Sequence, residues 1–296
     1  MSPGVDFLTA TTHDTVTCRD IFFASYNDLH RRYGQQEEDP TDPGWLDDAL
    51  SHLLRTDPGG TVLALEDGAP CGFAASYRRD TYWFLSFLFV LPEVQGRGVG
   101  RDLLEAVLPS DELTRALVVE SFQPASTGLY AAYGITPRSV RYMVSGPSHL
   151  ERLPGMPSDL RAEPMSEADG TAIAELDRRH LGYARPQDHA WWHAGSKGWV
   201  YRRGDEVVGY GYRDEEGVAP ALGRDEATLC AIVADLLRRS EDPAKEQVPV
   251  RGETAALFGM LVRAGGRIAP SGYRYLYCSS AGPLPATYSD YAGYMP

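Results

Sequence analysis

Three glycines that alternate along the chain, Gly96, Gly98 and Gly100, form the densest chemical signal in the sequence. They lie in the segment LFVLPEVQGRGVG, after an apolar run and before a stretch with helical spacing. Because glycine has no Cβ, several backbone N–H groups can converge there on one anion. The N-terminus of the following helix adds unpaired N–H groups and a partial positive charge. The pattern therefore predicts a cradle for a phosphate or pyrophosphate group.

Two common phosphate-binding loops do not fit this spacing. A P-loop requires Gly-Lys-Ser or Gly-Lys-Thr, and the segment contains no lysine. The dinucleotide fingerprint requires GxGxxG after the first strand of a βαβ unit, whereas these glycines are spaced two residues apart and follow a hairpin. A glycine-rich turn without a ligand is the structural alternative.

Residues downstream of the loop narrow this choice. Glu120 stands late in an otherwise apolar strand, and the segment LYAAYG follows at residues 129–134. Together with Pro92 and the glycine loop, these segments resemble the GNAT superfamily of acyl-CoA N-acyltransferases. The resemblance covers most of residues 1–146 in element order and a shorter part by motif.

The resemblance implies a set of site residues. Tyr130 falls on the position that often carries the general acid for the leaving thiolate, with a core tyrosine as the alternative. Glu120 falls where a general base often acts, directly or through water, with a surface carboxylate as the alternative. The implied acyl-CoA contacts are a backbone amide near the end of the strand, the glycine loop, and two hydroxyl residues where the family has an Asn: Phe89, Val90, Gln95, Gly96, Arg97, Gly98, Val99, Gly100, Arg101, Ser126 and Thr127.

The elements that position these residues follow from periodicity and turn signals. The first half predicts helices over 14–32, 44–55, 98–108 and 126–133, and strands over 61–66, 71–79, 81–90, 116–121 and 138–145. The second half repeats this order weakly, with strands over 160–165, 198–203, 206–213, 247–250 and 267–279, and helices over 166–180, 225–239 and 254–264. A Pro/Gly/Ser-rich stretch separates the halves.

The predicted fold class is therefore mixed α/β (α+β), with two GNAT-like domains. Each domain is expected to be a mixed, mostly antiparallel sheet flanked by helices. The predicted limits are 1–146 for the first domain, 147–159 for the linker, and 160–296 for the second domain with a tyrosine-rich tail. Asp225 and Glu226 stand where the second domain would need free helix amides, and acidic side chains there repel a pyrophosphate. We expect the second domain to lack a full acyl-CoA site.

Composition excludes several other functions. The net charge of −13 disfavours nucleic acids and anionic membranes as partners and favours a cationic substrate. The apolar runs are too short for a transmembrane helix, and the first residues lack the features of a signal peptide. A cytoplasmic location, with the four cysteines as free thiols, is therefore expected.

Two further groups of residues have weaker signals. His189 and His193 have metal-ligand spacing on a helix, but no Glu follows His189, so we expect packing and no metal. Aromatic residues on the first two helices lie where acceptor pockets form in the family, most of them as core residues: Phe22, Phe23, Tyr26, Tyr33 and Trp45.

The predicted function is transfer of an acetyl or other short acyl group from acyl-CoA, with acetyl-CoA as co-substrate. The expected acceptor is the primary amine of a small metabolite, such as an antibiotic, an amino sugar or an amino-acid-like compound. The alternatives are a protein or peptide N-acetyltransferase and a non-catalytic acyl-CoA-binding protein. The chain is expected to act as a monomer or a homodimer.

Overall fold

The computed structural model describes residues 4–214, 217–268 and 275–290. Residues 269–274 of the predicted strand 267–279, and residues 291–296 of the predicted tail, lie outside these ranges. The chain divides into two compact units. Unit 1 comprises residues 1–78 and 82–117, and unit 2 comprises residues 79–81 and 118–296.

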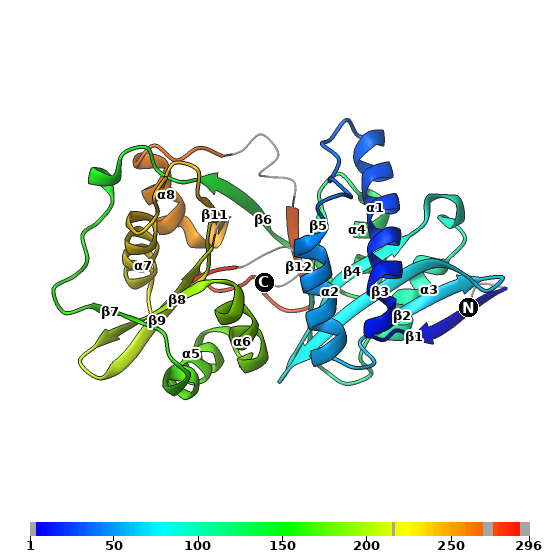
Figure 1. Ribbon diagram of the computed structural model, residues 1–296, viewed down its shortest axis with the longest axis horizontal. Coiled ribbons are helices and arrows are strands. Elements are labelled where there is room, and N and C mark those ends of the chain that lie inside the picture. Colours follow the sequence, from blue (N-terminus) through cyan, green and yellow to red (C-terminus); the bar gives the residue numbers. More distant parts are fainter. Residues whose placement is uncertain (1–3, 215–216, 269–274, 291–296) are drawn as a thin grey trace. The chain divides into compact units, whose positions relative to one another are not determined.

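Two repeats of one element order run along the chain (Figure 1). The first repeat contains β1 (Val5–Thr9), α1 (Thr15–Arg32), α2 (Gly44–Thr56), β2 (Thr61–Glu66), β3 (Ala69–Arg79), β4 (Tyr82–Val90), α3 (Val99–Val107), β5 (Thr114–Glu120), α4 (Pro124–Ala132) and β6 (Thr136–Ser145). The second contains β7 (Arg161–Pro164), α5 (Gly170–Leu181), α6 (Pro186–Gly195), β8 (Lys197–Arg203), β9 (Glu206–Arg213), β10 (Val218–Gly223), α7 (Glu226–Arg238), β11 (Gln247–Arg251), α8 (Ala255–Arg263) and β12 (Tyr275–Ser279). A short strand, β13 (Tyr288–Ser289), follows the second repeat. The predicted fold class is confirmed.

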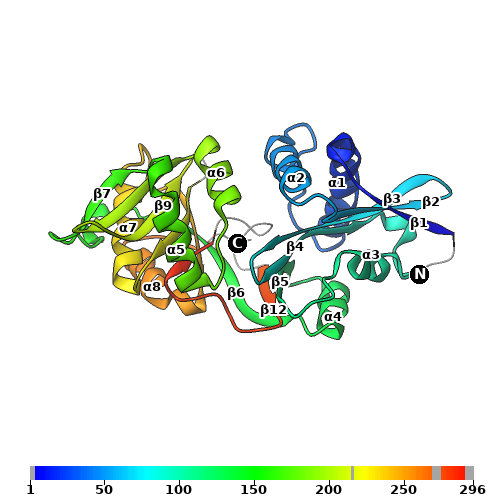
Figure 2. The ribbon, with the colours of Figure 1, turned by 90° about the horizontal axis from the view of Figure 1, so that it is seen from below.

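Unit 1 is built on a sheet in the order β1-β2-β3-β4-β5. β1 and β3 pair antiparallel with β2, and β4 pairs parallel with β5. α1 and α2 cover one face of this sheet and α3 covers the other (Figure 2). The alternation of β4 side chains explains this, because Phe87 and Phe89 contact Phe22 of α1, whereas Leu88 and Val90 face Gly100 of α3.

Unit 2 contains the antiparallel strands β12, β6 and β11, and a second antiparallel sheet in the order β13-β10-β9-β8-β7. The two faces of β9 carry different residues. A Cβ on Gly209 would lie 2.4 Å from Ile232 of α7, so this face of β9 has glycine where α7 packs closely. On the opposite face, Tyr210 and Tyr212 reach side chains of α5 and α6.

The compact units and the predicted domains divide the chain differently. β6 ends at Ser145 and β7 begins at Arg161, so the two repeats meet in the stretch that the sequence predicted as a linker. β6 nevertheless groups with unit 2, because it pairs with β11 and β12. The domain limits therefore stay a prediction about the repeats.

One element of the second repeat, β10, was not predicted, and α6 was expected only as a helix carrying His189 and His193, without limits. α6 begins with Pro186 and holds two adjacent tryptophans, so it lacks a clear helical periodicity. β10 (VAPALG) contains Pro220, which indicates a loop rather than an inner strand. The register of β10 on β9 shifts between Val218 and Ala221, and this irregularity accommodates the proline.

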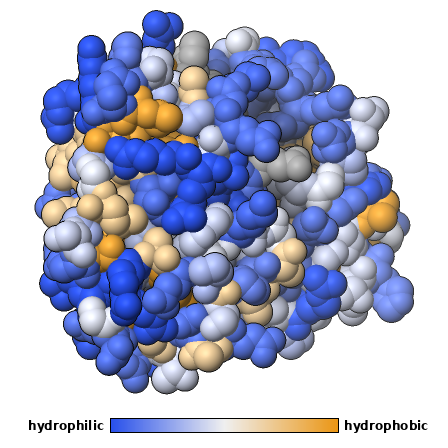
Figure 3. Space-filling view, turned by 60° about the vertical axis from the view of Figure 1, so that its left-hand side comes forward, coloured by the Kyte–Doolittle hydropathy of each residue, from blue (hydrophilic) through white to orange (hydrophobic). Residues whose placement is uncertain are grey.

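Most large apolar side chains of the described residues are buried. The face shown in Figure 3 is mainly hydrophilic, with its hydrophobic residues in separate patches. Within the described ranges, the large hydrophobic residues that remain exposed are Leu8, Val16, Tyr33, Val262 and Ile268. None of the helices in these ranges is both long enough and apolar enough to cross a membrane.

Candidate functional site

The glycine loop connects β4 to α3 in unit 1. A short 3₁₀ turn, Pro92–Val94, follows β4, and α3 then begins at Val99. Gly96 has φ +79° and Gly98 has φ +96°, a left-handed conformation that side-chain-bearing residues rarely adopt. Gly98 is the N-cap of α3, and no side chain caps this helix. The amides of the first turn therefore have a glycine, rather than an acceptor side chain, beside them.

The loop is open to solvent on the side where an anion would approach. Residues 95–98 are exposed, while Val99 is buried and anchors α3 to the sheet. A Cβ placed on Gly96 would meet no atom within 4 Å. Two amides of the predicted run make turn bonds, since Gln95 N donates to Pro92 O at 3.4 Å and Arg101 N donates to Gly98 O at 2.9 Å.

The end of β4 is held by three hydrogen bonds. The carbonyl oxygen of Val90 accepts from Ser25 Oγ at 3.0 Å and from Gln95 Nε2 at 2.8 Å. On the other side of the same peptide, Leu91 N donates to Cys71 O at 2.8 Å. Ser25 is buried on α1 and was not singled out from the sequence. The side chain of Gln95 is thus turned back onto β4.

The pairing of β4 with β5 covers only part of each strand. The parallel register joins Tyr82–Leu85 to Thr114–Leu117. β4 continues to Val90 beyond the last pair of this register. The residues predicted to contact acyl-CoA, Phe89 and Val90, lie in this continuation.

The two arginines of the loop differ in their surroundings. Arg97 Nη1 lies 2.8 Å from Glu66 Oε1, and its Nη2 donates to Glu93 O at 2.9 Å. Its guanidinium group is therefore engaged by β2 and the 3₁₀ turn. Arg101 lies on the exposed side of α3.

Aromatic residues gather beside the end of β4. Phe89 is half-buried, and its ring centroid lies 4.8 Å from that of Phe22 and 6.0 Å from that of Phe73. Of the predicted acceptor-pocket residues, Phe22, Phe23 and Tyr26 belong to the core. Trp45 is half-buried and Tyr33 is exposed. The members of this group that are not fully buried are therefore Phe89, Trp45 and Tyr33.

The remaining predicted site residues belong to unit 2. Tyr130 lies on α4 and is buried, and burial, with a smaller effect of Cys278, raises its pKa far above the usual range. Its phenol therefore keeps its proton at neutral and moderately alkaline pH. Glu120 is buried at the end of β5. Of the two hydroxyl residues on α4, Thr127 donates Oγ1 to Gln123 O at 3.1 Å, and Ser126 is half-buried.

The corresponding junction of the second repeat, between β10 and α7, is capped by a side chain. Asp225 is the N-cap of α7, and its Oδ1 accepts from Thr228 N at 2.7 Å. Burial raises the pKa of Asp225, but hydrogen bonds from Thr228 and the charge of Arg203 lower it more, so this pKa lies below its usual value. A Cβ on Gly223 would lie 2.4 Å from Leu229 N, so only glycine fits where β10 turns into α7.

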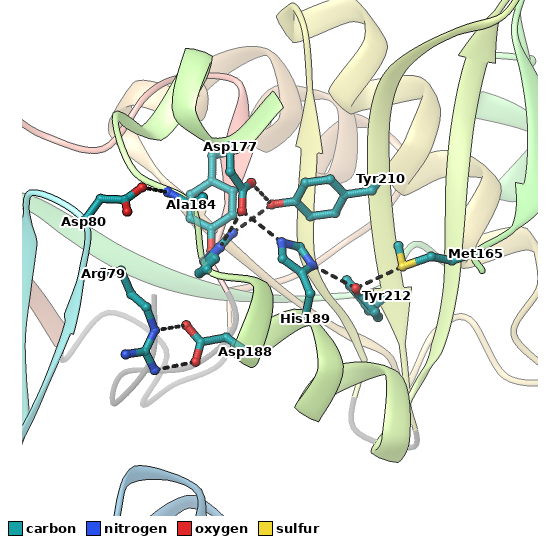
Figure 4. Close-up of polar contacts among 11 residues, drawn as sticks. Arg79, Asp80, Met165, Asp177, Ala184, Asp188, His189, Tyr210 and Tyr212 are labelled. Atoms are coloured by element: carbon teal, nitrogen blue, oxygen red, sulfur yellow. Dashed lines mark hydrogen bonds and ion pairs between the residues drawn. The ribbon is translucent and has the colours of Figure 1, made fainter. Parts of the chain in front are cut away.

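A buried polar cluster lies between β9, α5 and α6 of unit 2 (Figure 4). Asp177 Oδ2 lies 2.9 Å from His189 Nε2, and its Oδ1 accepts from Tyr210 OH at 2.6 Å. Arg185 Nε lies 3.2 Å from the same Asp177 Oδ2, and His189 Nδ1 lies 2.8 Å from Tyr212 OH. Each of these polar groups has a partner within the cluster, which supports the prediction that His189 packs. Within the described ranges, no group of three potential metal ligands is present.

Comparison with known proteins identifies a protein family for the region around the glycine loop. Residues 19–135 match the Acetyltransferase (GNAT) family model. These residues are thus a GNAT-family acetyltransferase domain, as the glycine loop and the LYAAYG segment predicted. An uncharacterised N-acetyltransferase from Archaeoglobus fulgidus is 41% identical over 66 residues, which are 19% of this chain. The chain covers 43% of that relative's length.

Solved structures resemble nearly the whole chain. A candidate acetyltransferase from Pyrococcus horikoshii covers 99% of this chain and 96% of its own, with a TM-score of 0.74 at 15% identity. A GCN5-related N-acetyltransferase from Sphaerobacter thermophilus covers 96% and 99%, with a TM-score of 0.59 at 16% identity. A tandem GNAT protein from the clavulanic acid biosynthesis pathway covers 94% and 99%, with a TM-score of 0.59 at 15% identity. These similarities show that the two-repeat architecture is a tandem GNAT fold.

Proposed function

We propose that this chain is an N-acetyltransferase that moves an acetyl or other short acyl group from acyl-CoA to the primary amine of a small metabolite. The observation that carries the proposal is the glycine-capped N-terminus of α3, directly after β4 and within a GNAT-family domain. The acidic balance of the chain, −13, favours a cationic acceptor, because opposite charges increase the rate of encounter.

The residues present suit the diphosphate and pantetheine parts of acetyl-CoA. The amides of Gly96, Arg97, Gly98, Val99 and Gly100 form the proposed diphosphate cradle, with the turn-bonded Gln95 and Arg101 at its edges. The part of β4 beyond its register with β5 offers main-chain groups to the pantetheine arm. Arg97, held by Glu66, shapes the loop in this proposal and leaves phosphate binding to the amides. When bound, acetyl-CoA supplies the thioester whose acyl group is transferred.

Three tasks fall to the chain's own groups. A backbone N–H near Phe89 and Val90 stabilises negative charge on the acyl oxygen, and the bonds to the Val90 carbonyl keep that stretch of β4 fixed. Glu120 accepts a proton from the acceptor amine, directly or through water, since only the neutral amine is a nucleophile. Tyr130 holds a proton for the leaving thiolate, and its raised pKa ensures that the proton is present.

The proposal is tested by measuring thiol release from acetyl-CoA with a panel of amines. The panel contains polyamines, amino sugars, amino acids and a set of peptides with free N-termini or lysines. The expected result is turnover with one class of small amine, and its loss in Gly98→Glu. Preference for peptides would favour a protein acetyltransferase. Binding of acetyl-CoA without turnover on any amine would favour a non-catalytic binding protein, and absence of binding would contradict the proposal.

A further inference from the structure

In the second repeat, as in the first, the fourth strand pairs with the fifth over only part of its length. β10 and β11 hold the places of β4 and β5 in the element order. They meet at a parallel bridge between Gly217 and Gln247. Beyond it β10 pairs with β13, since Ala221 is opposite Ser289 and Leu222 is opposite Tyr288 in an antiparallel register. The segment after the second repeat therefore lies against the edge of β10.

The same segment is also bonded to β11. Ser289 Oγ donates to Pro249 O at 2.7 Å, and Arg251 Nη2 donates to Tyr288 O at 2.9 Å. Asp290 Oδ1 lies 3.3 Å from Arg251 Nη1. Residues 288–290 thus bridge the edges of β10 and β11 and fill the space between them.

A backbone hydrogen bond joins the end of β10 to the segment that precedes β13. Gly223, the last residue of β10, donates its backbone N–H to Thr287 O at 3.0 Å. Val90 holds the same place at the end of β4. Tyr288, Ser289 and Asp290 have relative exposures of 0%, and the Tyr288 hydroxyl accepts from Arg185 at 2.7 Å. The segment is therefore an internal part of unit 2.

We propose that residues 287–290 occupy, in the second repeat, the slot that receives the pantetheine arm of acyl-CoA in the first, and that this docked segment closes the second repeat to acyl-CoA. The identity of the slot's ligand rests on the proposed function, whereas the docking of the segment does not. An extended peptide and a pantetheine arm share one chemistry, because both present amide groups to a strand edge. The β13 segment is thus a covalently attached competitor for the slot.

Two features make the closure complete. Asp225 caps α7, so the diphosphate of a CoA molecule finds an acidic side chain where the first repeat offers free amides. Asp290 contacts two buried arginines, Arg141 at 3.0 Å and Arg251 at 3.3 Å, so release of the segment leaves both without this carboxylate. The probe for an opened slot is therefore pantetheine, which lacks the diphosphate.

The test uses the full chain with Gly98→Glu, which removes the first site. Into it we introduce Ser289→Ala with Asp290→Asn, which together remove the hydroxyl donor to Pro249 and the charge facing Arg251. Asp242→Asn, on the exposed surface of unit 2, is the matched control for loss of one charge. Amide hydrogen exchange at Gly223 reports docking of the segment, and calorimetric titration with pantetheine reports opening of the slot.

The expected result is at least about tenfold faster exchange at Gly223 in the double variant, with one pantetheine bound per chain. The control and the Gly98→Glu parent show slow exchange and no binding. Pantetheine binding to the parent, or fast exchange at Gly223 without pantetheine binding in the double variant, would overturn the closure. In the second case, acetyl-CoA binding to the wild-type chain tells separately whether the proposed function stands.

If the double variant does not fold, a single substitution tests the same proposal. If its thermal transition is not cooperative, Ser289→Ala alone keeps Asp290 with both arginines. Faster exchange at Gly223 in this variant, with weak but saturable pantetheine binding, supports the proposal. Exchange at the parent rate shows that the segment is not a separable occupant and overturns it.

Discussion

α3 and α7 begin at equivalent places in the two repeats, each directly after the fourth strand, and they are capped in opposite ways. Gly98 gives α3 a left-handed N-cap without a side-chain acceptor. Asp225 gives α7 an extended N-cap whose carboxylate accepts from the first turn. The first turn of α7 thus donates to the side chain of its own cap, whereas the first turn of α3 has no side-chain acceptor at its cap. A difference of a few residues decides whether a helix N-terminus is a ligand site or a stabilised end.

The largest expected effect is a loss of stability at alkaline pH, caused by the buried polar cluster between β9, α5 and α6 and by Tyr288 beside it. Burial raises the pKa values of Tyr210 and Tyr212, and raises that of Tyr288 to about 12. Unfolded tyrosine titrates near pH 10, so the stability that these groups contribute is complete below about pH 10 and is lost as the pH rises toward the folded pKa. Each contributes a slope of up to about 1.4 kcal/mol per pH unit. Urea unfolding between pH 8 and pH 12 is the measurement.

This alkaline loss can be assigned to the cluster with a single substitution. Tyr212→Phe removes one titrating phenol, so the slope above about pH 10 should fall by one tyrosine's share. A stability that stays flat to pH 12, or a slope unchanged in Tyr212→Phe, would show that the buried phenols do not govern it.

The next effect is on acetyl-CoA binding, which is expected to depend on the Gly98 cap of α3. Gly98→Glu is expected to weaken acetyl-CoA binding roughly a hundredfold or more, since it adds a negative charge at the helix N-terminus and strains a left-handed residue. Gly100→Ala is the matched control, because its Cβ would make ordinary contacts at 3.6 Å with Leu88 and 3.7 Å with Val90. Calorimetric titration measures both. Equal losses in the two variants would show that the cradle does not depend on the Gly98 cap.

Tyr130→Phe tests the proposed acid. The turnover number is expected to fall about 10²-fold with acetyl-CoA affinity unchanged, since only proton delivery to the thiolate is removed. Because the pKa of Tyr130 is raised, the wild-type rate should show no basic limb from this group below pH 10. Steady-state rates from pH 7 to pH 10 are the measurement. A variant that turns over normally at neutral and at high pH excludes the role.

Asp225→Ala is expected to lower the free energy of unfolding by about 1 kcal/mol, the usual effect of losing an N-cap. Asp225→Asn keeps an acceptor oxygen and should retain most of it. Because the pKa of Asp225 is lowered, the charge-dependent part is present above about pH 4 and is lost as the pH falls through the folded pKa. Denaturant unfolding at pH 7 and pH 3 is the measurement. Acetyl-CoA binding at the first repeat should not change.

The smallest effect concerns the support of β4. Ser25→Ala removes one of the two side-chain donors to the Val90 carbonyl, and Gln95 still donates to it. A loss of about 1 kcal/mol in stability and a change of a few-fold in kcat/KM are expected. Ser25→Thr keeps the hydroxyl and is the control. A larger effect on KM for acetyl-CoA than on stability would mean that Ser25 orients the strand end for the ligand.

Local pattern was enough to predict much of this molecule. Glycine at residues 96 and 98 marked the turn before α3, because both residues have a positive φ that side-chain-bearing residues rarely adopt. Asp225 was singled out because an acidic side chain at a helix start repels a pyrophosphate, and the structure places it as the N-cap of α7. The order of the elements followed from apolar periodicity and turn signals, apart from β10 in the second repeat.

What the sequence did not predict depends on contacts between distant residues. Ser25 has no local signal, since its role arises only when α1 packs beside Val90, 65 positions away. β10 was missed because Pro220 indicates a loop, and the irregularity that tolerates it depends on pairing with β9. The burial of Tyr288 was not predicted either, because its partners are Arg185, the residue before α6, and Arg251 of β11.

The position of β13 has a consequence for the order of synthesis. Domains fold as the chain emerges from the ribosome, N-terminal parts first. Residues 287–290 follow every other described element, so β10 and β11 have no occupant between them until these residues emerge. The nascent second repeat therefore carries an open strand edge that chaperones or a second nascent chain can pair with, and the arrival of residues 287–290 removes that hazard.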